Sequence, residues 1–334
     1  MNIIMAGIDY KLAPIDVREG FSFTKAMMKQ VYSNILKDTM IYGTVIISTC
    51  NRTEIYISCE EDFCVNPFEV LCNAAGIDFT PYEKVHRVKE GDEVIKHLCQ
   101  LACGVKSQIW GEDQIITQVK NAIAVSREMR AADSYLEVMF RNAIAAAKKV
   151  KSTLILNSRE NSIVHKALKI IKDQETMNIR EILVIGNGEM GRLMTNVLIE
   201  NGYRATMTLR QYRYHANVIP LNANTVDYSN RYEKMKDCDV VISATLSPHY
   251  TVEMENLKKI DKIPKLFIDL AVPRDIDPSI KNLPNIELYD VDGIGADEIS
   301  KNHAQQLKGI ERIIEKYICD YHKWCLFKEG LGCI

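Results

Sequence analysis

The sequence predicts two α/β parts: an N-terminal ferredoxin-like βαββαβ unit with a helical segment, and a Rossmann-type doubly wound parallel sheet followed by a long C-terminal helix. Three observations support this class. Apolar and helical segments alternate in the order βαββαβ over residues 1–90. A helical stretch with almost no glycine or proline comes next. After residue 180, short apolar segments alternate with helices, which is typical of a parallel sheet.

The composition is that of a globular protein: of 334 residues, 47% are hydrophobic and 26% are charged. No uncharged apolar run approaches the roughly 18 residues that span a bilayer, and the N-terminus lacks the pattern of a signal peptide. We therefore expect no membrane association and a cytoplasmic location. A net charge of −2 gives no electrostatic case for nucleic acid, although it is compatible with a local basic patch. The ten cysteines show no recognised zinc spacing, so we expect no bound metal.

The N-terminal elements follow from apolar spacing, with Ser22 as a candidate cap of the first helix. In order, we expect a strand over 3–8, a helix over 24–38, strands over 44–49 and 54–58, a helix over 66–75 and an edge strand over 84–88. Residues 91–172 are expected to be helical. Leu136, Phe140, Ile144 and Ala147 form an apolar stripe that indicates a packed face.

The second part is expected to contain five buried strands separated by helices, after which a helix extends over 293–328. The strands are predicted over 181–185, 205–209, 240–244, 266–270 and 286–289. We accordingly divide the chain into domains 1–160 and 161–292 and a C-terminal helical element 293–334.

A GxGxxG motif comprises Gly186, Asn187, Gly188, Glu189, Met190 and Gly191. It directly follows a predicted strand and opens a helix, which is the context that dinucleotide binding requires. The first glycine permits the tight turn, the second lets the main chain approach a pyrophosphate, and the third lets helix and strand pack closely. The N–H groups at the helix start favour phosphate. The motif therefore predicts a dinucleotide cofactor.

The end of the second strand of this part indicates which cofactor binds. NAD sites usually place Asp or Glu there for the ribose, whereas a cation accommodates the 2′-phosphate of NADPH. This chain has Arg210 and no acid at that point, so NADPH is predicted. Thr245 is expected to lie near the nicotinamide, at the carboxyl end of a later strand.

Cys50 occupies a constrained turn between two strands, with Arg52 near enough to favour its thiolate. A free cysteine is more often a buried structural residue, so its chemistry alone leaves both interpretations open. The surrounding sequence is more informative. It runs Ser48-Thr49-Cys50-Asn51-Arg52-Thr53-Glu54-Ile55-Tyr56.

That run resembles the signature of the glutamyl-tRNA reductase family, and the resemblance covers about residues 4 to 320. It includes the opening Gly7–Pro14, the helical stretch from His97 to Lys120, Gly186–Gly191, Ile268–Asp275 and Tyr289–Asp292. The resemblance implies that domain 1–160 is catalytic and binds substrate, and that domain 161–292 binds NADP. It also implies that NADPH reduces glutamyl-tRNA(Glu) to glutamate-1-semialdehyde, the first committed step of tetrapyrrole synthesis.

In the reaction implied by the resemblance, Cys50 attacks the acyl ester and forms a glutamyl thioester. Arg52 matches the position that pairs with the substrate carboxylate, and His97 matches a histidine beside the thiol that orients substrate or donates a proton. Further positions that match the substrate site are Thr49, Ser107, Glu112, Gln114 and Gln118. A packed or capping histidine is the alternative for His97, and structural hydrogen bonding is the alternative for Glu112 and Gln114.

The chain departs from the family where a helical dimerisation domain commonly follows the long helix, so we expect a shortened form and leave dimerisation open. Glutamate-1-semialdehyde aminotransferase is a candidate partner by the same resemblance. Two alternatives remain: a shikimate-dehydrogenase-like NADP oxidoreductase in which Cys50 is incidental, and a non-catalytic paralogue that binds glutamyl-tRNA.

Overall fold

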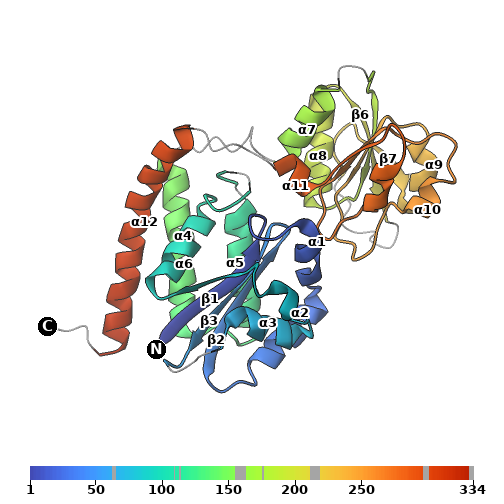
Figure 1. Ribbon diagram of the computed structural model, residues 1–334. Coiled ribbons are helices and arrows are strands. Elements are labelled where there is room, and N and C mark those ends of the chain that lie inside the picture. The colour runs from blue at the N-terminus through green and yellow to red at the C-terminus, as the bar shows by residue number, and fades with distance from the viewer. Residues whose placement is uncertain are drawn as a thin grey trace. The chain divides into compact units, whose positions relative to one another are not determined.

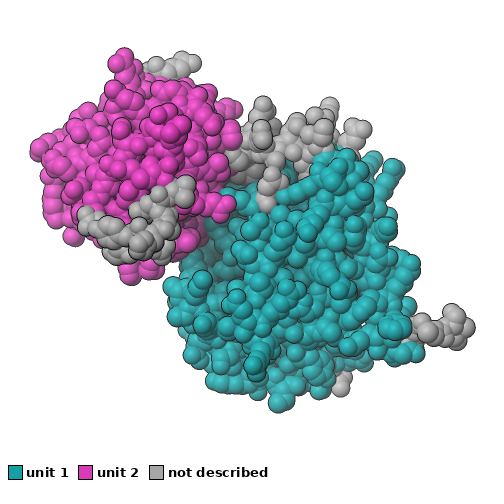
Figure 2. Space-filling model, turned by 180° about the vertical axis from the view of Figure 1, so that it is seen from behind, with its two compact units in different colours: residues 1–158, 297–334 teal, residues 159–296 magenta. Residues whose placement is uncertain are grey.

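The computed structural model describes residues 1–61, 65–108, 110–112, 114–154, 163–174, 177–210, 219–295 and 301–330. The chain divides into two compact units, which Figure 2 colours separately. Unit 1 comprises Met1–Ser158 and Asp297–Ile334, and unit 2 comprises Arg159–Ala296. Unit 1 is thus built from two segments of the chain, with unit 2 inserted between them in the sequence. No helix in these described ranges is long and apolar enough to cross a membrane.

The sheet of unit 1 has four antiparallel strands in the order β2-β3-β1-β4 (Figure 1). The elements are β1 Asn2–Asp9, α1 Ile15–Arg18, α2 Lys25–Ile35, β2 Ile41–Thr49, β3 Arg52–Cys59, α3 Pro67–Ala75 and β4 Arg87–Glu90. This order and pairing confirm the expected ferredoxin-like βαββαβ unit.

Helices cover both faces of this sheet, because successive side chains along a strand point to opposite faces. Ile4 and Ile55 belong to the core formed with α2 and α3. Their neighbours Met5 and Tyr56 belong to the core formed with α4 (Asp92–Ala102), α5 (Gln114–Glu128) and α6 (Ser134–Thr153). The predicted helical segment after residue 91 therefore serves to bury the second face of the sheet.

Two local expectations are corrected. Thr24, not Ser22, caps α2: its Oγ1 accepts a hydrogen bond from the Met27 main-chain N–H at 3.3 Å. Thr24 immediately precedes the first helical residue, which is the position from which a side chain reaches the free N–H groups. The edge strand begins at Arg87, where its pairing with β1 begins, after a short 3₁₀ turn over Thr80–Tyr82.

The last helix, α12 (Lys301–Lys328), packs against α4 and α6 of unit 1, as Figure 1 shows. Its Ile310, Ile314 and Tyr321 are buried in the same core as those helices. The helix expected over 293–328 also overlaps α11 (Val291–Gly295), and residues 296–300 lie outside the described ranges.

The sheet of unit 2 is parallel, with six strands in the order β10-β9-β8-β5-β6-β7. The strands are β5 Glu181–Ile185, β6 Arg204–Leu209, β7 Asn224–Asp227, β8 Val240–Ser243, β9 Leu266–Asp269 and β10 Glu287–Tyr289. One core contains α7 (Ile163–Lys172), α8 (Glu189–Glu200) and part of α11, and the other contains residues of α9 (Arg231–Met235) and α10 (Met254–Leu257). These two cores confirm the expected doubly wound, Rossmann-type sheet. The sequence did not predict β7, which is a short polar edge strand.

Candidate active site and cofactor site

Cys50 lies on the tight turn that joins β2 and β3. Thr49 pairs with Arg52 in the strand register, so Cys50 and Asn51 are the two turn residues. The main chain of the turn is held from two sides: the Tyr10 N–H donates to the Asn51 carbonyl at 2.9 Å, and the buried Arg18 guanidinium donates to the Cys50 carbonyl. The turn is therefore fixed while the thiol remains half-buried.

A pocket opens at this turn and encloses about 240 Å³, part of it open solvent. It is lined by Thr49, Cys50, Asn51, Arg52, Ser107, Glu112, Ile115 and Gln118. Of the residues predicted for catalysis and substrate binding, His97 and Gln114 do not line it.

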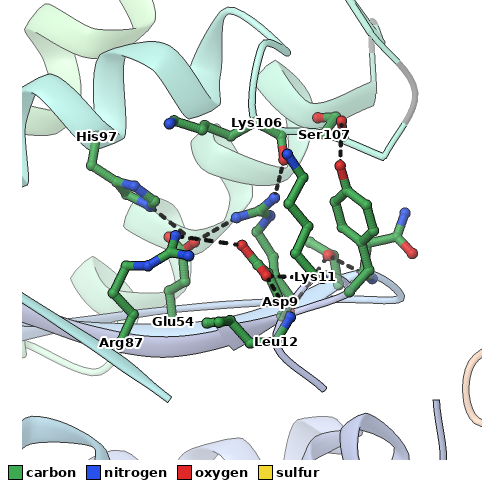
Figure 3. Close-up of polar contacts among 12 residues, drawn as sticks. Asp9, Lys11, Leu12, Glu54, Arg87, His97, Lys106 and Ser107 are labelled. Atoms are coloured by element: carbon green, nitrogen blue, oxygen red, sulfur yellow. Dashed lines mark hydrogen bonds and ion pairs between the residues drawn. The ribbon is translucent and has the colours of Figure 1, made fainter. Parts of the chain in front are cut away.

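Behind the pocket, Glu54 is the centre of a buried polar cluster. Its carboxylate accepts hydrogen bonds from Arg52 Nη1 at 2.6 Å, from Tyr56 Oη at 2.6 Å and from His97 Nε2 at 3.0 Å. Figure 3 shows His97 directed from α4 toward Glu54. Burial acts to raise the pKa of Glu54, but the neighbouring His97 and Arg52 outweigh it and hold that pKa below its ordinary value. Glu54 is therefore a buried carboxylate that stays ionised.

Arg52 connects this cluster to the segment that follows α4. Its Nη1 binds Glu54, and its Nη2 donates to the Lys106 carbonyl, so both terminal nitrogens already have an acceptor within the protein. The side chain is 1% exposed. A guanidinium has five N–H groups, and these two hydrogen bonds use only two of them. The remaining N–H groups of Arg52 can therefore donate to a ligand carboxylate in the pocket. Arg52 thus has a structural role beside the substrate contact predicted for it.

The thiol of Cys50 is not activated in this state. Burial raises its pKa to about 11, and the negative charge of Glu112 adds to the increase. Arg18 and Arg52 lower the pKa, as expected for Arg52, but burial outweighs them. At neutral pH the thiol is protonated, so thiolate formation requires a change in the charges around it.

Three buried polar atoms near the site lack a hydrogen-bond partner among the described residues: Asn51 Oδ1, Ser107 Oγ and His97 Nδ1. Such atoms are rare in native proteins and call for an explanation. Asn51 and Ser107 line the pocket, so both atoms are placed where a ligand could meet them. His97 does not line the pocket and reaches Arg52 only through Glu54.

Sequence reasoning missed Glu54, Arg18 and Asn51 as parts of the site. A signal for Glu54 was present, because residues two apart on a strand share a face and Arg52 and Glu54 are oppositely charged. Arg18 gave no comparable signal, since its interaction with the turn joins segments far apart in the sequence.

The GxGxxG glycines have separable roles between β5 and α8. A Cβ on Gly186, whose φ is +111°, would lie 2.5 Å from the Ala244 carbonyl oxygen, and one on Gly191 would lie 2.1 Å from the Gly186 oxygen. Both clashes are with the protein's own main chain. A Cβ on Gly188 would meet no described atom within 4 Å. Gly188 is the N-cap residue of α8. Because it has no side chain, it leaves open space at the start of the helix, and such a space suits a phosphate.

The other predicted cofactor residues lie around the carboxyl ends of the strands. Arg210 follows β6, and its guanidinium stacks on the Tyr228 ring, 4.4 Å from the ring centre. Thr245 donates to Asp275 through its N–H at 2.7 Å and its hydroxyl at 2.6 Å, so its side chain supports the loop. Asn187 lies in the turn, and Glu189 and Met190 begin α8. Their contact with a cofactor stays a prediction.

Comparison with known proteins gives matches to both units. Residues 6–154 match the family model "Glutamyl-tRNAGlu reductase, N-terminal domain", and residues 166–296 match "Shikimate / quinate 5-dehydrogenase". A glutamyl-tRNA reductase of Acetivibrio thermocellus is 62% identical over 331 residues, covering 99% of each chain. One of Clostridium novyi is 33% identical, covering 97% of this chain and 80% of that protein.

A multifunctional protein and a solved structure extend these matches. A probable multifunctional sirohaem biosynthesis protein of Ruminiclostridium josui is 40% identical, and this chain spans 64% of its length. The structure of glutamyl-tRNA reductase from Methanopyrus kandleri has a TM-score of 0.52 at 24% identity, covering 97% of this chain and 80% of that chain. At that identity the structural match supports the fold alone.

Proposed function

The chain belongs to the glutamyl-tRNA reductase family, and from this premise we propose that the pocket at Cys50 carries out the family's reaction. That reaction is the NADPH-dependent reduction of glutamyl-tRNA to glutamate-1-semialdehyde, the first step of tetrapyrrole synthesis. The observation that supports the assignment of the site is the pocket itself, which brings Cys50 and Arg52 at the β2–β3 turn together with Ser107 and Glu112 from the stretch between α4 and α5.

The glutamyl group carries an ammonium and a carboxylate, and the pocket has a partner for each. Glu112 suits the ammonium, and the remaining N–H groups of Arg52 suit the carboxylate. Ser107 offers a hydroxyl without a partner among the described residues. An ammonium beside Glu112 also neutralises a charge that raises the Cys50 pKa, so substrate binding itself favours the thiolate.

In the first step, Cys50 Sγ forms a bond to the acyl carbon, and the ester bond to the terminal ribose breaks. The thiol proton balances the departing ribose oxygen, so tRNA leaves with a free hydroxyl. His97 and Glu54 lie behind Arg52 and hold its guanidinium at the pocket wall, so we assign them positioning roles. The sequence-based expectation that His97 orients substrate or donates a proton stays a prediction, and its hydrogen bond to Glu54 supports the positioning role.

Unit 2 has the features that NADPH binding requires. Gly188 leaves room for the pyrophosphate at the start of α8, and Arg210 supplies a cation for the 2′-phosphate. When bound, NADPH supplies the hydride that converts the thioester to the aldehyde. Gly186 and Gly191 keep strand and helix close enough for the α8 N–H groups to face the phosphates.

The product is a reactive aldehyde, which favours direct use by the enzyme that consumes it. We therefore also propose that the chain works in the cytoplasm and passes its product to glutamate-1-semialdehyde aminotransferase. Co-purification of the two proteins, with and without glutamyl-tRNA, tests this partner.

The central test is a single-turnover assay with acyl-labelled glutamyl-tRNA. Without NADPH, the native chain should retain label as a base-labile adduct, and added NADPH should release labelled semialdehyde. Cys50→Ser should abolish both signals, whereas Cys319→Ser, which alters an exposed cysteine on α12, should preserve both. Binding of tRNA without adduct or aldehyde would instead favour the non-catalytic alternative, and ketone reduction that survives Cys50→Ser would favour the shikimate-dehydrogenase-like one.

A further inference from the structure

Four cationic side chains gather beside the Cys50 pocket: Lys11, Arg87, Lys89 and Lys106. Lys11 follows β1, whose last residue pairs with Arg52 in the sheet register. Arg87 and Lys89 are two residues apart on β4 and therefore share a face. Lys106 immediately precedes the pocket residue Ser107. Figure 3 shows Lys11, Arg87 and Lys106 around the Asp9 and Glu54 carboxylates. We call these four residues the basic rim.

The carboxylates near the basic rim compensate it only in part. Lys89 pairs with Glu93 at 2.6 Å, but Glu93 is 70% exposed, and exposed pairs are weak. Arg87 lies 3.9 Å from Asp9, which also accepts main-chain N–H groups of Lys11 and Leu12. The rim is thus a local concentration of positive charge on a chain with a net charge of −2.

The rim residues are close enough to repel one another. Burial lowers the pKa of Lys106, and the positive charges of Lys11, Arg87, Lys89 and Arg52 lower it further. Such repulsion costs free energy in the unliganded protein, and an anion bound among these side chains would relieve it.

None of the four rim side chains lines the pocket. They lie next to residues that do, since Lys106 precedes Ser107 and Lys11 follows the β1 end that pairs with Arg52. Resting on the proposed function, we propose that the basic rim binds the phosphates of the single-stranded 3′ end of the acyl-tRNA. Phosphate contacts of this kind set register and orientation without reading sequence. They would place the terminal ribose ester at the mouth of the pocket.

The experiment compares two acyl donors in the same single-turnover assay: glutamyl-tRNA and glutamyl-adenosine, which carries the same ester but no phosphate. The variant is Lys11→Ala with Lys106→Ala, which leaves the Lys106 carbonyl in place for Arg52. Lys29→Ala is the control, because Lys29 is exposed on α2, whose core lies on the other face of the sheet.

We expect the double variant to bind glutamyl-tRNA more weakly, on the order of ten-fold. The half-saturating concentration of glutamyl-tRNA should rise, and the acylation rate at saturation should stay unchanged. The salt dependence of log affinity should become less steep by about 0.7 for each phosphate that the variant no longer neutralises. Acylation by glutamyl-adenosine should keep its native concentration dependence, Lys106→Arg should restore tRNA affinity, and Lys29→Ala should behave as native.

An equal decrease with both donors would overturn the proposal, because the rim would then serve the glutamyl group. Binding of uncharged tRNA tests the rim separately from catalysis. If native and double-variant proteins bind it with the same affinity and salt slope, the proposal is wrong even where Cys50 is acylated normally. If the native chain is acylated by neither donor, the proposed function fails, and the uncharged-tRNA slopes still decide whether the rim binds phosphate.

Discussion

Glu54→Gln should destabilise unit 1 strongly. The substitution preserves size but removes the negative charge that faces Arg52, whose side chain is 1% exposed, and weakens the acceptor for Tyr56 and His97. Removing one partner of a buried ion pair costs about 3–5 kcal/mol, because the other charge is left without compensation. For a unit of this size, each kcal/mol lowers the melting temperature by about 2–4 °C, so we expect a decrease of about 6–20 °C.

Tryptophan fluorescence measures this change in unit 1 alone, because both tryptophans of the chain, Trp110 and Trp324, belong to that unit. Glu137→Gln is the matched control. It breaks an ion pair with Arg127, which is 54% exposed, and exposed pairs contribute only about 0.2–1 kcal/mol. A Glu54→Gln melting temperature within about 2 °C of the native value, or equal to that of the control, would refute the reasoning.

Two further predictions concern the cofactor turn and the thiol. Gly191→Ala should lower the melting temperature of unit 2, because its Cβ would lie 2.1 Å from the Gly186 oxygen. Gly188→Ala should keep the native melting temperature but bind NADPH more weakly in a fluorescence titration. Equal melting temperatures of the two variants would contradict this prediction. Alkylation at Cys50, followed by peptide mass mapping, should accelerate about ten-fold per pH unit between pH 7 and 10, because the thiol pKa is about 11. Glu112→Gln should shift that profile to lower pH, and a plateau below about pH 8.5 in the native chain would contradict the assigned pKa.

The fold was predictable where its cause is local. The alternation that places Ile4 and Met5 on opposite faces is visible in the residues themselves, and so is the glycine spacing between β5 and α8. The β7 strand was not predictable in this way, because Asn224–Asp227 is short and polar. Its extended conformation depends on its pairing with β6, which the local sequence does not show.

The site was predictable as a set of residues but not as an arrangement. The motif around Cys50 identified the nucleophile turn, yet the hydrogen bond of His97 with Glu54 joins residues 43 positions apart in the sequence. Which side chains line the pocket and which lie behind it depends on how α4 packs on the sheet. The stacking of Arg210 on Tyr228 likewise required the position of the unpredicted β7, since Tyr228 directly follows that strand.

The placement of α12 has a consequence for the order in which the chain matures on the ribosome. Unit 2 occupies the middle of the sequence, so all of its residues are synthesised before Ile310, Ile314 and Tyr321. Domains generally fold as units as they emerge, which allows the nucleotide-binding half to fold first. The half that carries Cys50 begins earlier, but its core on α4 and α6 is covered only when the last helix arrives. A translation product that stops before α12 would therefore expose that apolar surface and be a candidate for aggregation or proteolysis.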